Sequence, residues 1–261
     1  MEEEYVSDEE YPTYFMRLRG LRRSVAASLP LEHSMKILDI ATGSAYFAME
    51  LARLDESLKI TGVDISERSF ETAQRNIGEN DLEGRLEVTL MDASRLRFPP
   101  SSFDMAVNFL GLKDIYMTRG LGGLQRTFRG VGKVVKPSGH FSFVVMPPEE
   151  AETPAQRLEV DVFSHICGAT WLSADGYLEL LGDAGFSLVG RETFYTGMKL
   201  TPDQAKEEMR FACEEAPKIF GVKTVSFSEA WSLFGDEIEK ERLGHYSRVV
   251  LMIAKKGKMP A

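Results

Sequence analysis

The sequence predicts an α/β protein with a doubly wound, mostly parallel sheet and helices on both faces. Short apolar runs rich in β-formers alternate with stretches of helical periodicity. Four successive runs also end in a polar side chain, at the edge of a parallel sheet where ligands bind. The polar residues at these ends are Asp39, Asp64, Asp92 and Asn108.

The first strand, turn and helix span residues 36–54. The run KILDI carries Asp39 and leads into a turn that contains Gly43, after which apolar residues recur at helical spacing up to Leu54. Gly43 has no Cβ to block a ligand from backbone N–H groups or to forbid positive φ. This unit therefore favours a nucleotide-like cofactor.

The next strands repeat the pattern. LKITGVDIS ends at Asp64, about twenty residues after Gly43, which is the separation that places an acid on a ribose. Ser66 is expected to cap the helix that follows. RLEVTLMDAS then ends near Asp92, and SFDMAVNFLGL near Asn108.

The remaining elements complete the sheet. The helix expected over residues 118–137 holds five glycines, each costing up to roughly 1 kcal/mol, and should break near Gly120. A turn at residues 137–139 precedes the fifth strand. Ser173 opens a helix that runs to Gly182, and AGFSLVGRETF and YSRVVLMIAKKG supply the last two strands.

This order of features resembles the class I S-adenosylmethionine-dependent methyltransferases, over roughly residues 35–195 and a last strand near 246–256. The resemblance implies a Rossmann-like, seven-stranded sheet whose last strand lies antiparallel between the fifth and sixth. The family's first loop reads acid-x-Gly-x-Gly-x-Gly, whereas this chain has Ala41 and Ala45 around Gly43. Because alanine is tolerated where φ is negative, these departures concern the detailed geometry of the turn more than cofactor binding.

The resemblance also implies a cofactor, S-adenosylmethionine, with S-adenosylhomocysteine as the product. Asp64 would hold both ribose hydroxyls, with Ile65 against the adenine. Asp92 would accept from the adenine amino group, and the Ala93 N–H would donate to a ring nitrogen. Residues 42–44 would face the methionine portion. The implied cofactor-binding residues are Asp39, Ala41, Thr42, Gly43, Ser44, Asp64, Ile65, Asp92, Ala93 and Asn108, the last of them below the sulfonium.

Each acid has a structural alternative. An acid at the end of a strand is often only the N-cap of the next helix, and this alternative stays open for Asp64 and Asp92, although Ser94 could cap instead of Asp92. A nicotinamide dehydrogenase would share the ribose acid. It would also need G-x-G-x-x-G, and here Ala45 and Ala48 stand at the later glycine positions.

Composition and charge limit the remaining functions. The 261 residues are 43% hydrophobic, which suffices for one large α/β domain, and the acidic start and the absence of a long apolar run predict a cytoplasmic protein. The formal net charge of -9 disfavours a nucleic-acid substrate, and RLRGLRR at residues 17–23 is interpreted as a solvated helix. We expect no metal site, and Cys167 and Cys213 are expected to be buried thiols.

The fifty or so residues between the last two strands depart from the minimal fold. We expect a helical insertion over about residues 198–244, with capping boxes at Thr201-Pro-Asp-Gln204 and Ser226-Phe-Ser-Glu229. Two amphipathic helices must bury their apolar faces, as a lid, a dimer interface or extra core. The predicted domains are an N-terminal helical lid segment, 1–34, and a methyltransferase domain, 35–256. Residues 147–156, rich in proline and acids, are expected to be a mobile connection.

Three functions follow from the resemblance. The first is methylation of a small molecule in a pocket that the insertion and the N-terminal aromatics Tyr11, Tyr14 and Phe15 would enclose. The second is a protein methyltransferase with an open groove, and the third is a binder of the cofactor without turnover. In-line transfer from a sulfonium requires no dedicated base. The catalytic residue stays unknown, with His140, His165, His245, Asp114 and Tyr116 as the available bases.

Overall fold

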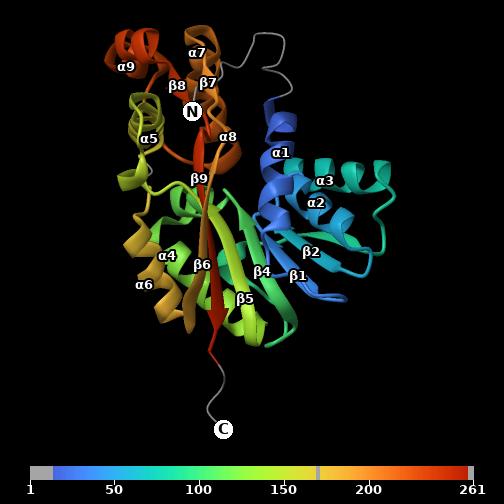
Figure 1. Ribbon diagram of the computed structural model, residues 1–261. Coiled ribbons are helices and arrows are strands. Elements are labelled where there is room, and N and C mark those ends of the chain that lie inside the picture. The colour runs from blue at the N-terminus through green and yellow to red at the C-terminus, as the bar shows by residue number, and fades with distance from the viewer. Residues whose placement is uncertain (1–13, 169–170, 258–261) are drawn as a thin grey trace. The chain divides into compact units, whose positions relative to one another are not determined.

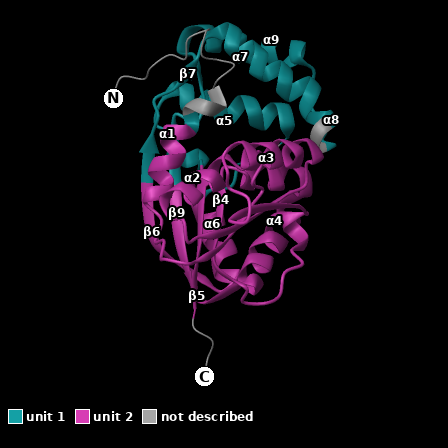
Figure 2. Cartoon of the chain, turned by 90° about the vertical axis from the view of Figure 1, so that its right-hand side faces the viewer, with its two compact units in different colours: residues 1–18, 146–173, 193–250 teal, residues 19–145, 174–192, 251–261 magenta. Residues whose placement is uncertain are grey.

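A computed structural model describes residues 14–168 and 171–257 of the chain. The chain clusters into two compact units, coloured separately in Figure 2. The unit that we call the sheet unit comprises residues 19–145, 174–192 and 251–261. The other, which we call the helical unit, comprises residues 1–18, 146–173 and 193–250. The domain boundaries expected from the sequence stay a prediction.

The sheet has seven strands in the order β3-β2-β1-β4-β5-β9-β6 (Figure 1). Strand β1 pairs in parallel with β2 and β4, β2 with β3, and β4 with β5, whereas β9 runs in the opposite direction. The predicted fold, with its last strand antiparallel between the fifth and sixth, is confirmed. The strands are β1 Lys36–Ile40, β2 Lys59–Asp64, β3 Leu86–Leu90, β4 Phe103–Phe109, β5 Val135–Val145, β6 Phe186–Tyr195 and β9 Arg248–Lys256.

Helices cover both faces of this sheet (Figure 1). The central strands are therefore mainly apolar: Ile37, Leu38 and Ile40 of β1 are fully buried, as expected when both faces are covered. The connections after β1 run in one direction along the sheet and those after β4 in the other, so the ends of β1 and β4 form the topological switch point. The helices are α1 Tyr14–Ala27, α2 Tyr46–Leu54, α3 Glu67–Glu79, α4 Leu112–Val134 and α6 Ala174–Asp183, with a 3₁₀ turn, η2, at Ala93–Arg95.

Helix α4 begins at the switch point and contains the predicted break. Gly120 has φ 64° and ψ -176°, which no helical residue adopts, so the helix is interrupted there. Beyond the break, Phe128 anchors the helix on the sheet, with its ring edge-on to Phe141 and Phe143 of β5 at centroid distances of 5.2 and 5.6 Å. The first turns of α4 thus form a separate short piece next to the strand ends.

The helical unit contains the predicted insertion. The Thr201–Gln204 capping box is present with Pro202 in the first turn, and the Ser226 side chain accepts the Glu229 N–H at 3.2 Å. Both predicted helix starts are confirmed. The elements are β7 Lys199–Leu200, α7 Pro202–Arg210, a π-helical turn at Phe211–Glu215, α8 Ala216–Phe220, α9 Phe227–Glu241 and β8 Leu243–Gly244, which pairs with β7.

The π-helical turn has a local cause. Pro217 has no N–H to donate to the carbonyl of Cys213, four residues earlier, and that carbonyl instead accepts the Thr224 hydroxyl at 2.8 Å. Burial raises the pKa of the Cys213 thiol to about 11, so it stays protonated and unreactive. Cys167 is half-buried and forms no disulfide, so the expectation of a buried thiol holds fully for Cys213 only.

The expectation of a mobile connection at residues 147–156 is wrong. Helix α5, Pro154–Cys167, starts within it at a complete Thr153–Gln156 capping box, the same Thr-Pro-x-Gln signature as at Thr201. The prolines and acids suggested a linker, but Pro154 stands at a position where a helix tolerates proline. A 3₁₀ turn at Pro148–Glu150 orders the residues before the box.

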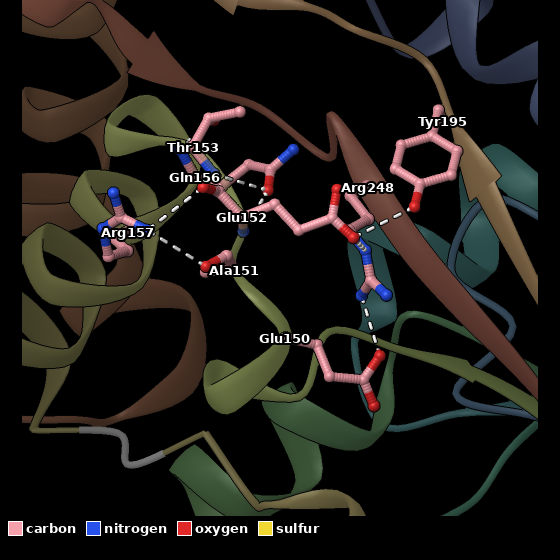
Figure 3. A network of polar contacts seen from close by, with 8 residues as sticks. All are labelled: Glu150, Ala151, Glu152, Thr153, Gln156, Arg157, Tyr195 and Arg248. Carbon is pink, nitrogen blue, oxygen red and sulfur yellow. Dashed lines mark hydrogen bonds and ion pairs between the residues drawn. The ribbon is translucent and has the colours of Figure 1, made fainter.

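A buried arginine also holds this segment (Figure 3). The Arg248 side chain is 12% exposed, and its guanidinium bonds Glu150 Oε2 at 2.8 Å and Glu152 Oε1 at 3.1 Å. The Tyr195 hydroxyl donates to the same Glu152 oxygen at 3.1 Å, and Arg157 donates to the carbonyls of Ala151 and Glu152. The start of α5 is thereby fixed to β6 and β9 within the helical unit.

Two glycines of α4 give a matched test of its packing. A Cβ on Gly132 would lie 2.5 Å from the Ala184 carbonyl oxygen, whereas one on Gly130 would meet only Leu96 at 3.5 Å, an ordinary contact. We expect Gly132→Ala to lower the free energy of unfolding by about 1 to 3 kcal/mol because backbone must move. Gly130→Ala should raise it by about 0.5 to 1 kcal/mol through helix propensity. Urea denaturation measures both, and a stabilised Gly132→Ala would contradict the packing of α4 against the end of α6.

Candidate cofactor site

The predicted site residues of β1, β2 and β4 meet at one edge of the sheet unit. Asp39 lies in register with Gly62 on one side and with Val107 on the other. Asp64 follows Gly62 by two residues on β2, and Asn108 follows Val107 by one residue on β4. Both residues therefore lie at the carboxyl ends of the strands that flank β1. The loops after β1, β2 and β4 therefore share one edge.

The turn after β1 is left-handed at every second residue. Ala41, Gly43 and Ala45 have φ of 51°, 56° and 64°. The two alanines thus keep the positive φ for which glycine is preferred, at a cost of roughly 1–2 kcal/mol each. The sequence analysis expected the two alanines to change the detailed geometry of the turn, because alanine is tolerated where φ is negative. The structure corrects this expectation, since φ is positive at both.

Neighbouring glycines make room for this turn. A Cβ on Gly111 would lie 2.8 Å from the Cβ of Ala41, and one on Gly62 would lie 2.8 Å from Cγ2 of Thr42. Apart from Gly43 and its two chain neighbours, no heavy atom of the described residues lies within 4 Å of the position of a Cβ on Gly43. The turn is packed on the sheet side and open beside Gly43.

Asp64 fixes this open part of the turn. Its Oδ2 accepts the Gly43 N–H at 2.8 Å, and its Oδ1 accepts the Ser66 N–H at 2.9 Å. The N-cap of α3 is Ser66, whose side chain accepts the Ser69 N–H, so the alternative that Asp64 is only a helix cap is wrong. Each carboxylate oxygen can accept one further hydrogen bond.

Apolar surface adjoins Asp64. Ile65 is 45% exposed, and Leu90, the register partner of Asp64 on β3, is 42% exposed. Single exposed apolar side chains are ordinary on protein surfaces. Ile65 and Leu90 stand out only by their place, since both lie at the carboxyl ends of adjacent strands, where an apolar part of a ligand could cover them.

Asp39 is the most deeply buried acid of the site. It is 1% exposed; its Oδ2 accepts the Thr42 hydroxyl at 2.6 Å, and its Oδ1 has no hydrogen-bond partner among the described residues. Burial raises the pKa of Asp39 to about 7, and the Asp64 charge adds to this, while the bond from Thr42 lowers it. A buried carboxyl with an unpaired oxygen favours a hydrogen-bond donor or a cation nearby.

Asp92 caps the 3₁₀ turn that follows β3. Its Oδ1 accepts the Ser94 N–H at 2.8 Å, and its Oδ2 accepts Nε of Arg119 at 2.9 Å. Burial raises the pKa of Asp92, but the bonds from Ser94 and Arg119 outweigh it, so that the pKa lies below its usual value. The capping interpretation is confirmed, and the carboxylate is ionised and 21% exposed beside the backbone of Ala93.

Asn108 uses its polar atoms on the backbone. The side chain is buried; it donates to the Ile40 carbonyl at 2.6 Å and accepts the N–H groups of Gly111 and Leu112 at 3.1 Å. It thus joins the end of β1 to the first turn of α4. The amide oxygen and one amide N–H are thus engaged in holding the two loops.

Arg22 of α1 lies against the loops after β1 and β4, a position that the sequence did not reveal. It is 7% exposed, and its guanidinium carbon lies 5.1 Å from the ring centroid of Tyr46 and 5.5 Å from that of Phe109. The stretch RLRGLRR was interpreted as a solvated helix, which is wrong for this residue. The available signal was its spacing of three and four residues from Val25 and Ala26, both fully buried.

The residues that the sequence offered as bases lie in different parts of the molecule. His165 and His245 belong to the helical unit, and His140 lies opposite Met105 near the start of β4, away from the loops. Asp114 lies in the first turn of α4. Burial raises its pKa, and the charge of Asp64 contributes in the same direction, so the two carboxyls share one environment. No described contact makes Asp114 or Tyr116 catalytic.

Within residues 14–168 and 171–257, no group of three or more His, Cys, Asp or Glu side chains is arranged to hold a metal ion. The described helices likewise include none that is long and apolar enough to cross a bilayer.

The comparisons with known proteins agree with this geometry. The profile of a methyltransferase domain matches residues 37–139, which run from β1 to the turn within β5. Residues 37–139 thus carry a methyltransferase domain, as the resemblance implied. S-adenosylmethionine, the cofactor that the resemblance implied, fits a methyltransferase domain.

Two curated relatives show how far the similarity extends. Demethylmenaquinone methyltransferase of Deinococcus radiodurans is 31% identical over 131 residues, 50% of this chain and 51% of that protein. The match thus spans about half the length of this relative. The 27-O-demethylrifamycin SV methyltransferase of Amycolatopsis mediterranei is 24% identical over 95% of this chain and 87% of that protein.

Solved structures share the fold of the methyltransferase domain. The [4+2]-cyclase SpnF superposes over 92% of this chain and 82% of that one, with a TM-score of 0.65 and 22% identity. A geranyl diphosphate methyltransferase in complex with S-adenosylmethionine covers 95% of this chain and 89% of that one, with a TM-score of 0.62 and 12% identity.

The buried Asp39 makes stability depend on pH. Its pKa is 3.8 in an ordinary environment and about 7 in the fold, so between these values the unfolded chain has lost a proton that the folded chain keeps. Stability therefore falls as pH rises through this window. Relative to Asp39→Asn, we expect wild type to lose about 3 kcal/mol of unfolding free energy between about pH 5 and pH 8.

Urea denaturation at both pH values measures this difference. Asp104→Asn is the control, because the pKa of Asp104 is held below its usual value and both states stay ionised throughout the window. A wild-type to Asp39→Asn difference that stays constant with pH would show that the Asp39 pKa is not raised.

Proposed function

We propose that the chain is an S-adenosylmethionine-dependent methyltransferase that acts on a small-molecule acceptor. The observation that carries the proposal is the Asp64 carboxylate, fixed at 2.8 Å on the Gly43 N–H at the end of β2 with spare acceptor capacity for two ribose hydroxyls. The cofactor-binding residues of this proposal are those expected from the sequence, with Asn108 acting through its hold on the loops.

The residues fit the cofactor chemically. The exposed Ile65 and Leu90 suit adenine, the ionised Asp92 suits its amino group, and the open side of Gly43 admits the methionine portion. The acids Asp39 and Asp64 favour a ligand that carries positive charge, as a sulfonium and an ammonium do. When bound, S-adenosylmethionine supplies an electrophilic methyl group.

The chain's contribution is then chiefly positional. Holding donor and acceptor in line supplies roughly 7–11 kcal/mol through effective molarity. The Asn108 bonds and the Asp64–Gly43 bond set the loops beforehand, so little ordering is left for the moment of reaction. No proton transfer is assigned, and the catalytic residue stays unknown.

A small-molecule acceptor is favoured by what the relatives' names say they act on. These are demethylmenaquinone and a demethylrifamycin, which are small molecules and not proteins.

It stays a prediction that the helices over residues 198–244 form a lid on the acceptor. A dimer interface and extra core are the alternatives. Of the N-terminal aromatics invoked for the pocket, Tyr11 lies outside the described residues, and so do the side chains of Tyr14 and Phe15. The cytoplasmic location stays a prediction too.

Calorimetry with S-adenosylmethionine and S-adenosylhomocysteine tests the cofactor site. Asp64→Asn keeps the shape but removes the charge that receives the ribose hydroxyls, and we expect both ligands to bind at least about tenfold more weakly. The matched control is Asp104→Asn. Asp104 lies near the start of β4, at the opposite edge of the sheet from the loops, and pairs with Lys136. Unchanged binding by Asp64→Asn would remove the ribose assignment.

Transfer of a labelled methyl group tests the reaction class. Methyl-deuterated S-adenosylmethionine and the enzyme are incubated with a metabolite fraction and, separately, with a protein fraction. We expect mass-shifted products among the metabolites only. Label in the protein fraction alone would favour the protein methyltransferase. Tight binding with no transfer to either fraction would favour the non-catalytic binder. The similarity to the [4+2]-cyclase SpnF shows that this fold is not confined to methyltransferases.

A further inference from the structure

The loop after β3 and the stretch from α4 through β5 carry positive charge only. Residues 93–103 and 115–148 contain seven Lys and Arg residues and no Asp or Glu, although the formal net charge of the chain is -9. A charge distribution this uneven creates a local positive potential on an otherwise acidic protein. The proposed methyl transfer gives these side chains no role.

The loop and the helix lie side by side within the sheet unit. Nε of Arg119 on α4 donates to Oδ2 of Asp92, the residue before η2, at 2.9 Å. Further along, the Ser101 N–H donates to the Lys133 carbonyl at 3.1 Å. The loop of residues 92–101 therefore runs along α4 from Arg119 to Lys133.

The second part of α4 directs its cations away from the sheet. Arg126, Arg129 and Lys133 recur at spacings of three and four residues, which places them on one side of the helix. All three are exposed, whereas Leu124 and Phe128 on the other side are fully buried. None of the three cations forms an ion pair with a described residue.

Two further cations extend this surface. Arg95 and Arg97, on the adjacent loop, are likewise exposed and form no ion pair with a described residue. We call the combined surface the basic face, and its members are Arg95, Arg97, Arg119, Arg126, Arg129 and Lys133. Arg119 alone of the six has a carboxylate partner in the described part of the chain. The other five attract an anionic partner.

The chemistry of the basic face limits what that partner can be. The centre of a protein–protein interface is apolar and depleted of charge, whereas cations occupy the outward positions here. Single-stranded nucleic acid binds where its bases stack on open aromatic rings. The aromatic residue of the loop, Phe98, is half-buried and packs edge-on against Phe103 at 5.0 Å, so it offers no such platform.

An anionic membrane needs neither feature, because its headgroups present negative charge without a fixed shape. We propose that the basic face docks the sheet unit on the surface of a membrane that contains acidic phospholipids. Each Lys or Arg held near such a surface strengthens binding about fivefold, and salt screens the attraction. Leu121, which is 44% exposed at the start of the second part of α4, is available to enter the headgroup layer. The proposal does not depend on the methyltransferase assignment.

Cosedimentation with lipid vesicles tests the proposal. Wild type should bind vesicles of phosphatidylcholine mixed with phosphatidylglycerol at least about a hundredfold more tightly than vesicles of phosphatidylcholine alone, and added salt should weaken the binding. A triple variant that removes the cations of α4 should bind the mixed vesicles about a hundredfold more weakly than wild type. Its substitutions are Arg126→Gln, Arg129→Gln and Lys133→Gln.

A second triple variant is the matched control. It removes the same charge from exposed positions on α1 and α3, through Arg23→Gln, Arg68→Gln and Arg75→Gln. The control should bind the mixed vesicles within about fivefold of wild type, since its cations lie outside the basic face. An equal loss in the two variants would overturn the proposal, because net charge alone would then explain the binding.

Three further outcomes would also overturn it. These are equal binding of wild type to the two kinds of vesicle, wild-type affinity in the α4 variant, and binding of wild type to duplex RNA or DNA but not to vesicles. If the α4 variant does not fold, acetylation of wild type by acetic anhydride decides. Mixed vesicles should reduce the reactivity of Lys133 and leave that of the exposed Lys36 unchanged. Unchanged reactivity of Lys133 would overturn the proposal.

Discussion

The buried amide of Asn108 is the constraint on which the rest of the site depends. Three hydrogen bonds join it to the backbone of Ile40 at the end of β1 and to Gly111 and Leu112 at the start of α4. Parallel strands bring their ends to one edge of a sheet, but they leave the loops beyond them free to diverge. Asn108 removes that freedom, and each of its bonds would leave a buried backbone group unsatisfied if it were lost.

The turn after β1 shows how this constraint is used. Ala41 and Ala45 hold left-handed conformations that cost alanine free energy, and the surrounding contacts must outweigh that cost. Asp64 contributes through the Gly43 N–H, and Asp39 through Thr42. In the proposed complex the same two acids favour a cationic ligand, so the groups that shape the loop would also contribute to binding.

The fold followed from the sequence because buried parallel strands are mainly apolar and polar residues mark their ends. The glycines around Gly120 predicted the break in α4, because glycine weakens a helix and adopts positive φ without strain. The start of α5 at Thr153 was missed because proline and acids were given more weight than the capping box. Arg22 was missed because an arginine next to buried helix positions is ordinarily solvated, and only the rings of Tyr46 and Phe109 show otherwise. The sign of φ at alanine has no signature in sequence.

The central claim is that the loops held by Asn108 and Asp64 receive S-adenosylmethionine. A crystal structure of the complex with S-adenosylhomocysteine tests it most directly. The account predicts ribose hydroxyls on the Asp64 carboxylate, the homocysteine portion beside Gly43, and no change in the Asn108 hydrogen bonds. A ligand bound away from the ends of β1 and β2, or a turn that loses the Asn108 bonds on binding, would contradict it.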